Sequence, residues 1–274
     1  INRLIEPTSG EVLVGGEDVL AMSDEELKNF RRSKASMVFQ KFALLPHRTV
    51  IENVGYGLQI QKITETEITK RSQHWIDRVG LTGFEDHYPA QLSGGMQQRV
   101  GLARALATDA EILLMDEAFS ALDPLIRTDM QGILLGLQAE LHKTIVFITH
   151  DLDEALRIGD EISILRDGEV VQQGTSQEIV MNPLDDYIAD FIKDVNRARV
   201  LEVRSIMEPS KTDKGPRLDL TTPLEDAMGK LSEAGETSGC VVDDKGHVIG
   251  KIELSAAISA IKRPEKTSTE LRYR

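Results

Sequence analysis

Three short apolar runs, set far apart in the chain, constrain its fold more than any other feature. They occupy residues 36–40, 111–117 and 144–150, and the third is rich in β-branched residues. The stretches between and after them have helical periodicity, at residues 65–80, 95–108 and 124–142. Strands that are apolar on both faces and joined through helices are typical of a parallel, doubly wound sheet. The sequence therefore predicts an α/β domain whose ligands bind at the carboxyl ends of these strands.

Two glycine-containing turns predict hairpins outside these strands. Residues 10–20 alternate around a Gly-Gly pair, and residues 161–174 turn at Asp167-Gly168. Two short helical stretches follow the second hairpin and end near Lys193. We expect these elements to belong to a first domain at residues 1–195.

A smaller module is expected after this domain. Residues 208–217 are polar and contain two prolines, which predicts a loop without regular structure. A β-α-β-β-α pattern then runs to about Ile261, and residues 263–274 are expected to form a charged tail. The second domain is therefore predicted to be a small α+β module at residues 200–262.

Composition limits the partners of this chain. Lys and Arg number 32 against 45 Asp and Glu, for a formal net charge of −13, and such a surface repels a phosphate backbone, so nucleic acid is not expected as a partner. The single cysteine, Cys240, cannot form an internal disulfide, which favours a reducing compartment such as the cytoplasm. No apolar run approaches the roughly 20 residues that cross a bilayer, so any membrane association is expected to use a partner.

The strand at residues 111–117 ends in two adjacent carboxylates. Asp116 and Glu117 follow four apolar residues, and charged groups seldom end a buried strand without a cation or a phosphate nearby. Mg²⁺ prefers oxygen ligands, so Asp116 is a candidate metal ligand, and Glu117 is a candidate base toward an attacking water. The alternative is a strand that exits into solvent with two surface acids.

Gln40 and His150 end the other two strands. The amide of Gln40 can donate to water and coordinate a cation. His150 comes to the same end of the sheet as the acid pair, where it could contact a terminal phosphate and sense its loss. An isolated glutamine does not by itself indicate a functional site, and a lone histidine is more often structural than catalytic.

The stretch LSGGMQQRV at residues 92–100 predicts an anion site at the start of a helix. Ser93 is placed to cap the helix, and Gly94 and Gly95 allow close backbone approach at its amino end. The alternative is an ordinary glycine turn before a helix.

These elements occur in an order that resembles a known family. The chain reads VFQ at 38–40, LSGGMQQRV at 92–100, ILLMDE at 112–117, SALD at 120–123 and ITH at 148–150. Five motifs in this order resemble an ABC-transporter nucleotide-binding subunit. The resemblance implies a P-loop NTPase-like ABC ATPase core with a helical subdomain at about residues 41–110, and ATP and Mg²⁺ as cofactors.

The resemblance also implies a role for each strand end. Gln40 is then the Q-loop glutamine, with a place in both nucleotide and Mg²⁺ binding. Asp116 and Glu117 are the Walker B pair, with Asp116 on the metal and Glu117 catalytic. His150 is the switch histidine, the second catalytic residue.

The remaining motifs imply a second copy of the chain. In the family two copies face each other head to tail, and each ATP lies between the phosphate loop of one copy and the signature motif of the other. The signature residues here are Ser93 to Met96, with Ser93, Gly94 and Gly95 toward the nucleotide. Asp123 is the D-loop aspartate, also a nucleotide-site residue.

Two longer stretches narrow the resemblance. Residues 117–131 and 149–175 are similar to the ATPase subunits of glycine betaine and proline betaine importers. This implies a peripheral subunit at the cytoplasmic face of the membrane that works with an integral membrane permease and, indirectly, with an extracytoplasmic substrate-binding protein. Substrate identity depends on the likeness alone, because this subunit does not touch the cargo.

One family motif is missing from the chain. The phosphate-binding loop, G-x-x-x-x-G-K-[ST], occurs nowhere in the 274 residues. In the family this loop immediately precedes a helix whose end resembles residues 1–10, and the chain starts at Ile1 and not at Met. We therefore expect a fragment without that loop and one early strand, which binds ATP weakly and does not hydrolyse it.

Residues 42–60 are unusually apolar for a loop. An exposed loop of this kind would suit docking to the permease, to which family members pass motion from Gln40. Membership of the hydrophobic core is an equal alternative.

The carboxyl-terminal module resembles one CBS motif, which would have to pair with another chain or with the tail. In adenosine-binding members a Thr or Ser and a later Asp hold the ribose, and here Glu253 and Ala256 take those places. This departure argues against adenosine binding. A module that regulates the ATPase, through ionic strength at its charged surface, and a ligand-free dimerising or stabilising appendage are both left open.

Two other functions compete with transport. An ABC ATPase in translation or DNA repair would be expected to carry a second cassette or a long insertion, and neither is present. A regulatory binding protein without catalysis is suggested by the missing loop, but retention of Glu117 and His150 argues against it.

Overall fold

A computed structural model describes residues 1–40 and 42–262. The chain forms two compact units, Ile1–Asp151 and a second unit that begins at Leu152. This division differs from the predicted boundary near residue 195, and Leu156, Ile162 and Ile179 share a buried cluster with Leu201 and Leu224 of the following module. The predicted charged tail at residues 263–274 lies outside the described residues.

The first unit contains the predicted parallel sheet. Its strands are β3 (Ala35–Val38), β4 (Ile112–Asp116) and β5 (Thr144–Ile148), in the order β3-β4-β5 and all parallel. The α/β fold and the three strands are thus confirmed. Each strand ends one or two residues earlier than predicted, so Gln40, Glu117 and His150 lie in the loops beyond the ladder.

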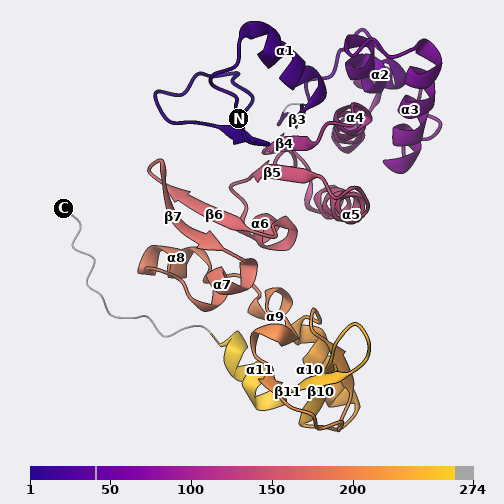
Figure 1. Ribbon diagram of the computed structural model, residues 1–274. Helices are drawn as coiled ribbons and strands as arrows, with labels where there is room; N and C mark the ends of the chain where they lie inside the picture. The colour runs from indigo at the N-terminus through magenta and orange to yellow at the C-terminus, as the bar shows by residue number, and fades with distance from the viewer. Residues whose placement is uncertain (41, 263–274) are drawn as a thin grey trace. The chain divides into compact units, whose positions relative to one another are not determined.

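Among the described residues of this unit, five α-helices accompany the sheet, and Figure 1 shows α2, α3 and α4 grouped to one side of it. They are α1 (Asp24–Ser33), α2 (Val50–Ile60), α3 (Glu65–Arg78), α4 (Gly94–Ala107) and α5 (Pro124–Leu141). A short 3-10 helix, η1 (Pro89–Gln91), precedes α4. The three predicted helices are confirmed to within two residues at each end.

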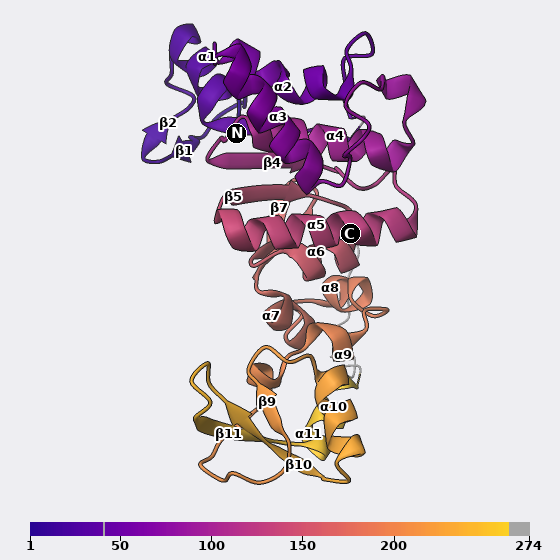
Figure 2. The same ribbon diagram turned by 90° about the vertical axis from the view of Figure 1, so that its right-hand side faces the viewer.

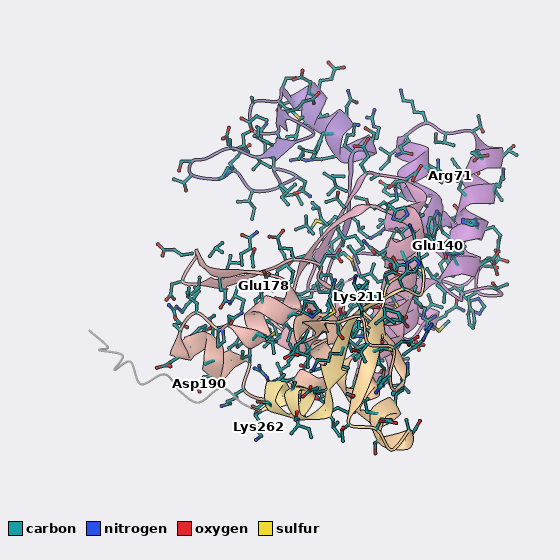
Figure 3. All side chains as sticks on the ribbon, turned by 60° about the horizontal axis from the view of Figure 1, so that its bottom comes forward. Arg71, Glu140, Glu178, Asp190, Lys211 and Lys262 are labelled. Atoms are coloured by element: carbon teal, nitrogen blue, oxygen red, sulfur yellow. The ribbon has the colours of Figure 1, made fainter. Side chains whose placement is uncertain are left out.

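Side-chain bonds tie these helices to one another. Arg71 of α3 donates to the carbonyl of Ala107 at the end of α4 at 2.7 Å, and Glu140 of α5 pairs with Arg78 of α3 at 2.7 Å. Arg71 and Glu140 are labelled in Figure 3. These contacts connect the middle of α3 to the end of α4, and the end of α3 to the last turn of α5.

The expectation of an apolar loop at residues 42–60 is wrong for its second half. Residues 50–60 form α2, which begins with a capping box between Thr49 and Glu52. Val54 and Leu58 of α2 are fully buried, so they belong to the core and offer no docking surface. The start signal, threonine followed three residues later by glutamate, was present in the sequence.

Two glycines obscured this helix. Gly55 and Gly57 weaken a helix by about 1 kcal/mol each relative to alanine. Packing accounts for both, because a Cβ at Gly55 would lie 2.8 Å from Cγ2 of Ile68, and one at Gly57 would lie 2.4 Å from Cγ2 of Thr108. Close approach of α2 to its neighbours therefore requires residues that local propensity disfavours.

A small hairpin completes the first unit. Strands β1 (Leu13–Val14) and β2 (Glu17–Asp18) pair antiparallel across Gly15-Gly16, which confirms the prediction for residues 10–20. Val19, Leu27, Phe30 and Ala35 form a separate buried cluster beside it. The hairpin and α1 are thus stabilised together against the start of β3.

The second unit begins with α6 (Leu152–Ile158) and the predicted second hairpin. Strands β6 (Ile162–Arg166) and β7 (Glu169–Gly174) pair antiparallel and turn at Asp167-Gly168, both with positive φ. That geometry is the type I′ turn favoured in two-residue hairpins. Short helices follow, α7 (Ser176–Met181), α8 (Asp186–Phe191) and α9 (Arg197–Val200), and then the 3-10 helix η2 (Val203–Ser205).

The carboxyl-terminal module has the predicted β-α-β-β-α order. Its elements are β9 (Arg217–Asp219), α10 (Leu224–Glu233), β10 (Ser238–Val242), β11 (Val248–Glu253) and α11 (Leu254–Ile261). Figure 2 shows α10 and α11 beside the sheet. The predicted loop at 208–217 instead supplies an edge strand, β8 (Glu208–Pro209), and the first residue of β9, giving the order β8-β11-β10-β9.

None of the helices in the described part of the chain is both long enough and apolar enough to cross a bilayer.

Cys240 lies on β10 beneath the segment that leads into β9. It is a free cysteine and fully buried, with Sγ 3.5 Å from Oδ1 of Asp213 and 3.8 Å from the carbonyl of Pro216. Burial, helped by the Asp213 carboxylate, raises the pKa of the Cys240 thiol. The thiol is therefore an inert core group in the folded module.

The raised pKa of Cys240 predicts a pH-dependent loss of stability. An unfolded thiol has a pKa of about 8.5. Above that pH the unfolded chain gives up a proton that the folded chain keeps, so the free energy of unfolding falls as pH rises. Urea unfolding followed by circular dichroism at pH 7.5 and pH 9.5 should show a larger fall for the native chain than for Cys240→Ala. Equal falls in the two proteins would contradict this assignment.

Candidate functional site

Glu117 occupies a strained position just past the end of β4. Its φ of 44° lies in the left-handed region, which costs a residue with a Cβ about 1–2 kcal/mol. The Glu117 amide donates to the carbonyl of Ile148 on β5 at 2.9 Å, and the Glu117 carbonyl accepts from Oγ of Ser120 at 2.9 Å. Strain that surrounding bonds hold in place is concentrated at functional sites in proteins.

The side-chain amide of Gln40 connects the loop after β3 to this residue. Nε2 of Gln40 donates to Oε2 of Glu117 at 2.7 Å and to Oγ of Ser120 at 3.3 Å. Hydrogen bonds to an ionised carboxylate are short and roughly twice as strong as neutral ones. The Glu117 carboxylate is therefore held by a neutral donor and not by a fixed cation.

His150 approaches the same carboxylate from the loop after β5. Its Nδ1 lies 3.5 Å from Oε2 of Glu117, and 70% of its side chain is exposed. The contact is an ion pair only when the ring is protonated. The exposed ring can therefore turn to a ligand beside Glu117. The structure thus brings Gln40, Glu117 and His150 together as predicted, while their catalytic and binding roles stay predictions.

Asp116 and Gln40, the residues expected to bind Mg²⁺, both offer oxygen donors. Asp116 is the exposed last residue of β4, and Nε2 of Gln40 is committed to Glu117, which leaves its Oε1 to coordinate a cation. Residues 1–40 and 42–262 contain no cluster of three or more acidic, histidine or cysteine side chains that could hold a metal. Mg²⁺ in nucleotide sites uses one or two carboxylates together with phosphate and water, so Asp116 and Gln40 fit such an ion.

The glycines at the start of α4 have different neighbours. Oγ of Ser93 accepts from the amide of Met96 at 3.3 Å, which is the predicted cap. A Cβ at Gly95 would lie 2.5 Å from Cγ2 of Ile126, whereas one at Gly94 would find its nearest neighbour, Phe42, at 4.0 Å. Gly95 is thus explained by packing against α5, and only Gly94 leaves open space at the helix start.

The described residues show no hydrogen bond or ion pair between this helix start and the cluster around Glu117. Within one chain, Ser93, Gly94 and Gly95 therefore do not join Gln40 and His150. Such a separation is what the expected head-to-tail pairing of two copies requires, and the nucleotide role of these residues stays a prediction.

Asp123 has a structural role in the chain itself. Its Oδ1 accepts from the amides of Leu125 and Ile126, both at 3.1 Å, and caps α5. The following Pro124 is the first residue of the helix, a position that suits proline. A role for Asp123 at a nucleotide remains a prediction beside this cap.

Two contacts of the site were missed by sequence reasoning. Ser120 was part of a recognised motif but had no role assigned, although its hydroxyl contacts both Gln40 and Glu117. Arg127 of α5 pairs with Asp151 at 2.8 Å and so ties α5 to the residue after His150. The motif pointed to Ser120, whereas no local pattern links Arg127 to Asp151.

Comparison with known proteins decides the family. A family model described as ABC transporter matches residues 1–120. A glycine betaine/carnitine transport ATP-binding protein, GbuA of Listeria monocytogenes, is 49% identical over 98% of this chain and 67% of its own length. A trimethylamine N-oxide transport ATP-binding protein, TmoW of Pelagibacter ubique, is 42% identical over 97% of this chain and 78% of its own length. The chain belongs to the ABC transporter family.

Other ABC transporter proteins extend this comparison. The glycine betaine transport ATP-binding protein OpuAA of Bacillus subtilis is 52% identical over 95% of this chain, which spans only 61% of that relative's length. A dimeric ATP-binding cassette, MJ0796, bound to ADP and Pi, matches with a TM-score of 0.59 and 38% identity over 64% of this chain and 77% of its own. CbiO1 of Clostridium perfringens matches with a TM-score of 0.61 and 27% identity over 70% of this chain and 75% of its own.

Proposed function

We propose that this chain acts as the ATP-hydrolysing subunit of an ABC importer for an osmoprotectant quaternary amine such as glycine betaine or proline betaine. The observation that carries the proposal is the meeting of Gln40, Glu117 and His150 at the carboxyl ends of three parallel strands. The substrate class is supported by the printed names of relatives, which include glycine betaine, carnitine and trimethylamine N-oxide transport proteins.

We infer a part of the reaction for each side chain, and the contacts among the three support these roles. Glu117 accepts a proton from the water that attacks the terminal phosphate, because it is the carboxylate around which the other two converge. Gln40 orients this carboxylate through its 2.7 Å bond, and His150 contacts the terminal phosphate. Asp116 and Gln40 would hold Mg²⁺, which when bound would neutralise negative charge on the phosphate oxygens.

The partners follow from the same proposal. A second copy, facing the first head to tail, supplies Ser93, Gly94 and Gly95 to the nucleotide, and Asp123 lies at that interface. A membrane permease binds the assembly at the cytoplasmic face and receives motion from the loop after Gln40. An extracytoplasmic substrate-binding protein delivers the solute to the permease.

For the carboxyl-terminal module we propose regulation of the ATPase in the manner of a CBS motif. Glu253, just before α11, pairs with Lys251 at 2.8 Å, and Lys251 also pairs with Glu208 at 3.3 Å. Glu253 stands where adenosine-binding members use a Thr or Ser. A module that serves only dimerisation is the alternative. Neutralising exposed charges of the module, as in Lys230→Gln with Lys245→Gln, would leave the salt dependence of transport unchanged under the alternative and would alter it under regulation.

A direct consequence concerns nucleotide affinity. The 274 residues contain no G-x-x-x-x-G-K-[ST] sequence, so the backbone cradle and lysine that bind phosphate are not supplied by this polypeptide. We expect a Kd for ATP weaker than about 1 mM, equivalent to less than about 4 kcal/mol of binding. Isothermal titration of the chain with MgATP measures it, and micromolar binding would refute this expectation.

The test of the proposed function uses a hybrid protein, in which the chain follows a segment that carries a G-x-x-x-x-G-K-[ST] loop. Phosphate release by the hybrid should exceed that of the unmodified chain by at least about 10²-fold. When the hybrid is reconstituted with the permease of a betaine importer, its rate of ATP hydrolysis should rise on addition of glycine betaine and the binding protein for that solute. A rate of hydrolysis that does not change with the solute would favour a role outside transport. An inactive hybrid would favour a regulatory binding protein.

A further inference from the structure

The segment between Gln40 and α2 contains a turn that needs outside support. Phe42 and Ala43 have φ values of 52° and 45°, two consecutive left-handed residues that are not glycine. Residues with a Cβ rarely adopt this conformation, and they keep it only where neighbouring bonds impose it. The turn is bonded back toward Gln40, because the Phe42 amide donates to the carbonyl of Phe39 at 3.2 Å.

Arg104 of α4 supplies bonds to both residues of the turn. Its Nη1 donates to the carbonyl of Ala43 at 2.7 Å, and its Nη2 donates to the carbonyl of Phe42 at 3.0 Å. The planar fork of a guanidinium suits two adjacent acceptors in a way that an ammonium does not. Arg104 therefore bridges the two strained residues directly.

Arg104 is partly shielded from water, so its charged side chain depends on these two hydrogen bonds. Burial lowers the pKa of Arg104, and the described residues include no carboxylate that pairs with it. The Arg104 side chain is half-buried and its guanidinium stays charged, so the donors shielded from water require acceptors. The acceptors it has are the carbonyls of the turn.

The far end of the same segment is fixed separately. Asn53 of α2 is fully buried, accepts from the amide of Leu45 at 2.8 Å and donates to the carbonyls of Leu45, Arg48 and Thr49. Asn53 therefore holds residues 45–49 to α2. The end beside Gln40 is held to α4 through Arg104.

We propose that Arg104 is a positioning residue, which holds the turn at Phe42 and Ala43 so that the Gln40 amide stays on the Glu117 carboxylate. The role in hydrolysis rests on the proposed function, whereas the clamp itself does not. The same helix begins with Gly94 in the predicted nucleotide motif, so α4 connects that motif to Gln40.

The clamp is tested in the 274-residue chain itself by Arg104→Gln. The Phe42 amide donates to the carbonyl of Phe39 at 3.2 Å, and its hydrogen exchange should accelerate at least about tenfold when the turn is released. The side-chain amide signal of Gln40 in a ¹⁵N spectrum should move toward that of a free glutamine. Exchange at Leu45, which Asn53 holds, should change by less than about twofold.

Arg99→Gln is the matched control on the same helix. Arg99 donates to the carbonyl of Val79 at 2.8 Å and pairs with Asp129 at 3.0 Å, away from the turn. It should leave Phe42 exchange and the Gln40 signal unchanged. The proposal is overturned if Arg104→Gln leaves both signals unchanged, or if Arg99→Gln alters them equally.

Arg104→Lys provides a second variant in case the glutamine variant does not fold. A lysine keeps the charge but offers no planar fork, so it should give an intermediate exchange rate at Phe42. In the hybrid protein, Arg104→Lys should lower kcat about threefold to tenfold, because a displaced Gln40 amide no longer holds the Glu117 carboxylate in its reactive position. An equal change of kcat in Arg99→Lys would overturn the positioning role, whereas a hybrid without any hydrolysis would count against the proposed function alone.

Discussion

Glu117→Gln in the hybrid protein is expected to lower the rate of ATP hydrolysis by about 10²–10⁴-fold, the range associated with a lost general base. Glutamine has the size of glutamate and can still accept from Nε2 of Gln40 through its amide oxygen. It cannot take a proton from the attacking water. ATP affinity should therefore stay within about threefold of the unmodified hybrid, because the change acts on the transition state and not on binding.

Glu111→Gln gives a control with the same change of charge beside the same strand. Glu111 immediately precedes β4 and pairs with Lys34 at 2.6 Å, with 68% of its side chain exposed. Exposed ion pairs contribute about 0–1 kcal/mol, so hydrolysis should change by less than about twofold. The rates of single-turnover phosphate release of the Glu117→Gln and Glu111→Gln hybrids are to be compared with that of the unmodified hybrid. Full activity of Glu117→Gln would remove Glu117 from the catalytic step.

Phe119→Ala is expected to lower the free energy of unfolding of the first unit by about 3–5 kcal/mol. Phe119 is fully buried two residues after Glu117, and its ring centroid lies 5.6 Å from that of Phe147 on β5. Truncation removes this ring pair and leaves a cavity between the site loop and the sheet. Since a domain is stable by only about 5–15 kcal/mol in total, the variant should unfold at a much lower urea concentration.

The single tryptophan, Trp75 of α3, is buried and reports on the first unit by fluorescence. Phe84→Ala, the same substitution at a ring that is 36% exposed, should cost about 1 kcal/mol or less. An equal loss of stability in both variants would mean that the buried Phe119 ring contributes no more to the free energy of unfolding than the exposed Phe84 ring.

Local patterns were sufficient for most elements of this fold. The three apolar runs correctly predicted β3, β4 and β5, because the strands of a parallel sheet covered on both faces need continuous apolar sequence, although every residue of β5 is exposed or half-buried in this structure. The Gly-Gly and Asp-Gly turns gave both hairpins because only such residues adopt positive φ cheaply. The predicted strands extended one or two residues too far, since polar residues at their ends continue the extended pattern but leave the hydrogen-bonded ladder.

Local patterns failed where packing overrides propensity. Gly55 and Gly57 lower the helix propensity of residues 50–60, yet the neighbouring elements leave no room for a Cβ at either position. Residues 208–217 read as a loop, yet their two ends pair with β10 and β11. In both places the deciding contact comes from a residue distant in sequence.

The sequence by itself determined which side chains stand at the strand ends, because parallel strands with apolar interiors leave their carboxyl ends to polar residues. It therefore placed Gln40, Glu117 and His150 near one another. Only the tertiary structure decided that Gln40 donates to Glu117 across 77 residues, that Ser120 joins them, and that Arg104 holds the turn beside Gln40. Hydrogen bonds form within a few tenths of an ångström, and that precision arises from the packing of whole helices and strands, which no local pattern records.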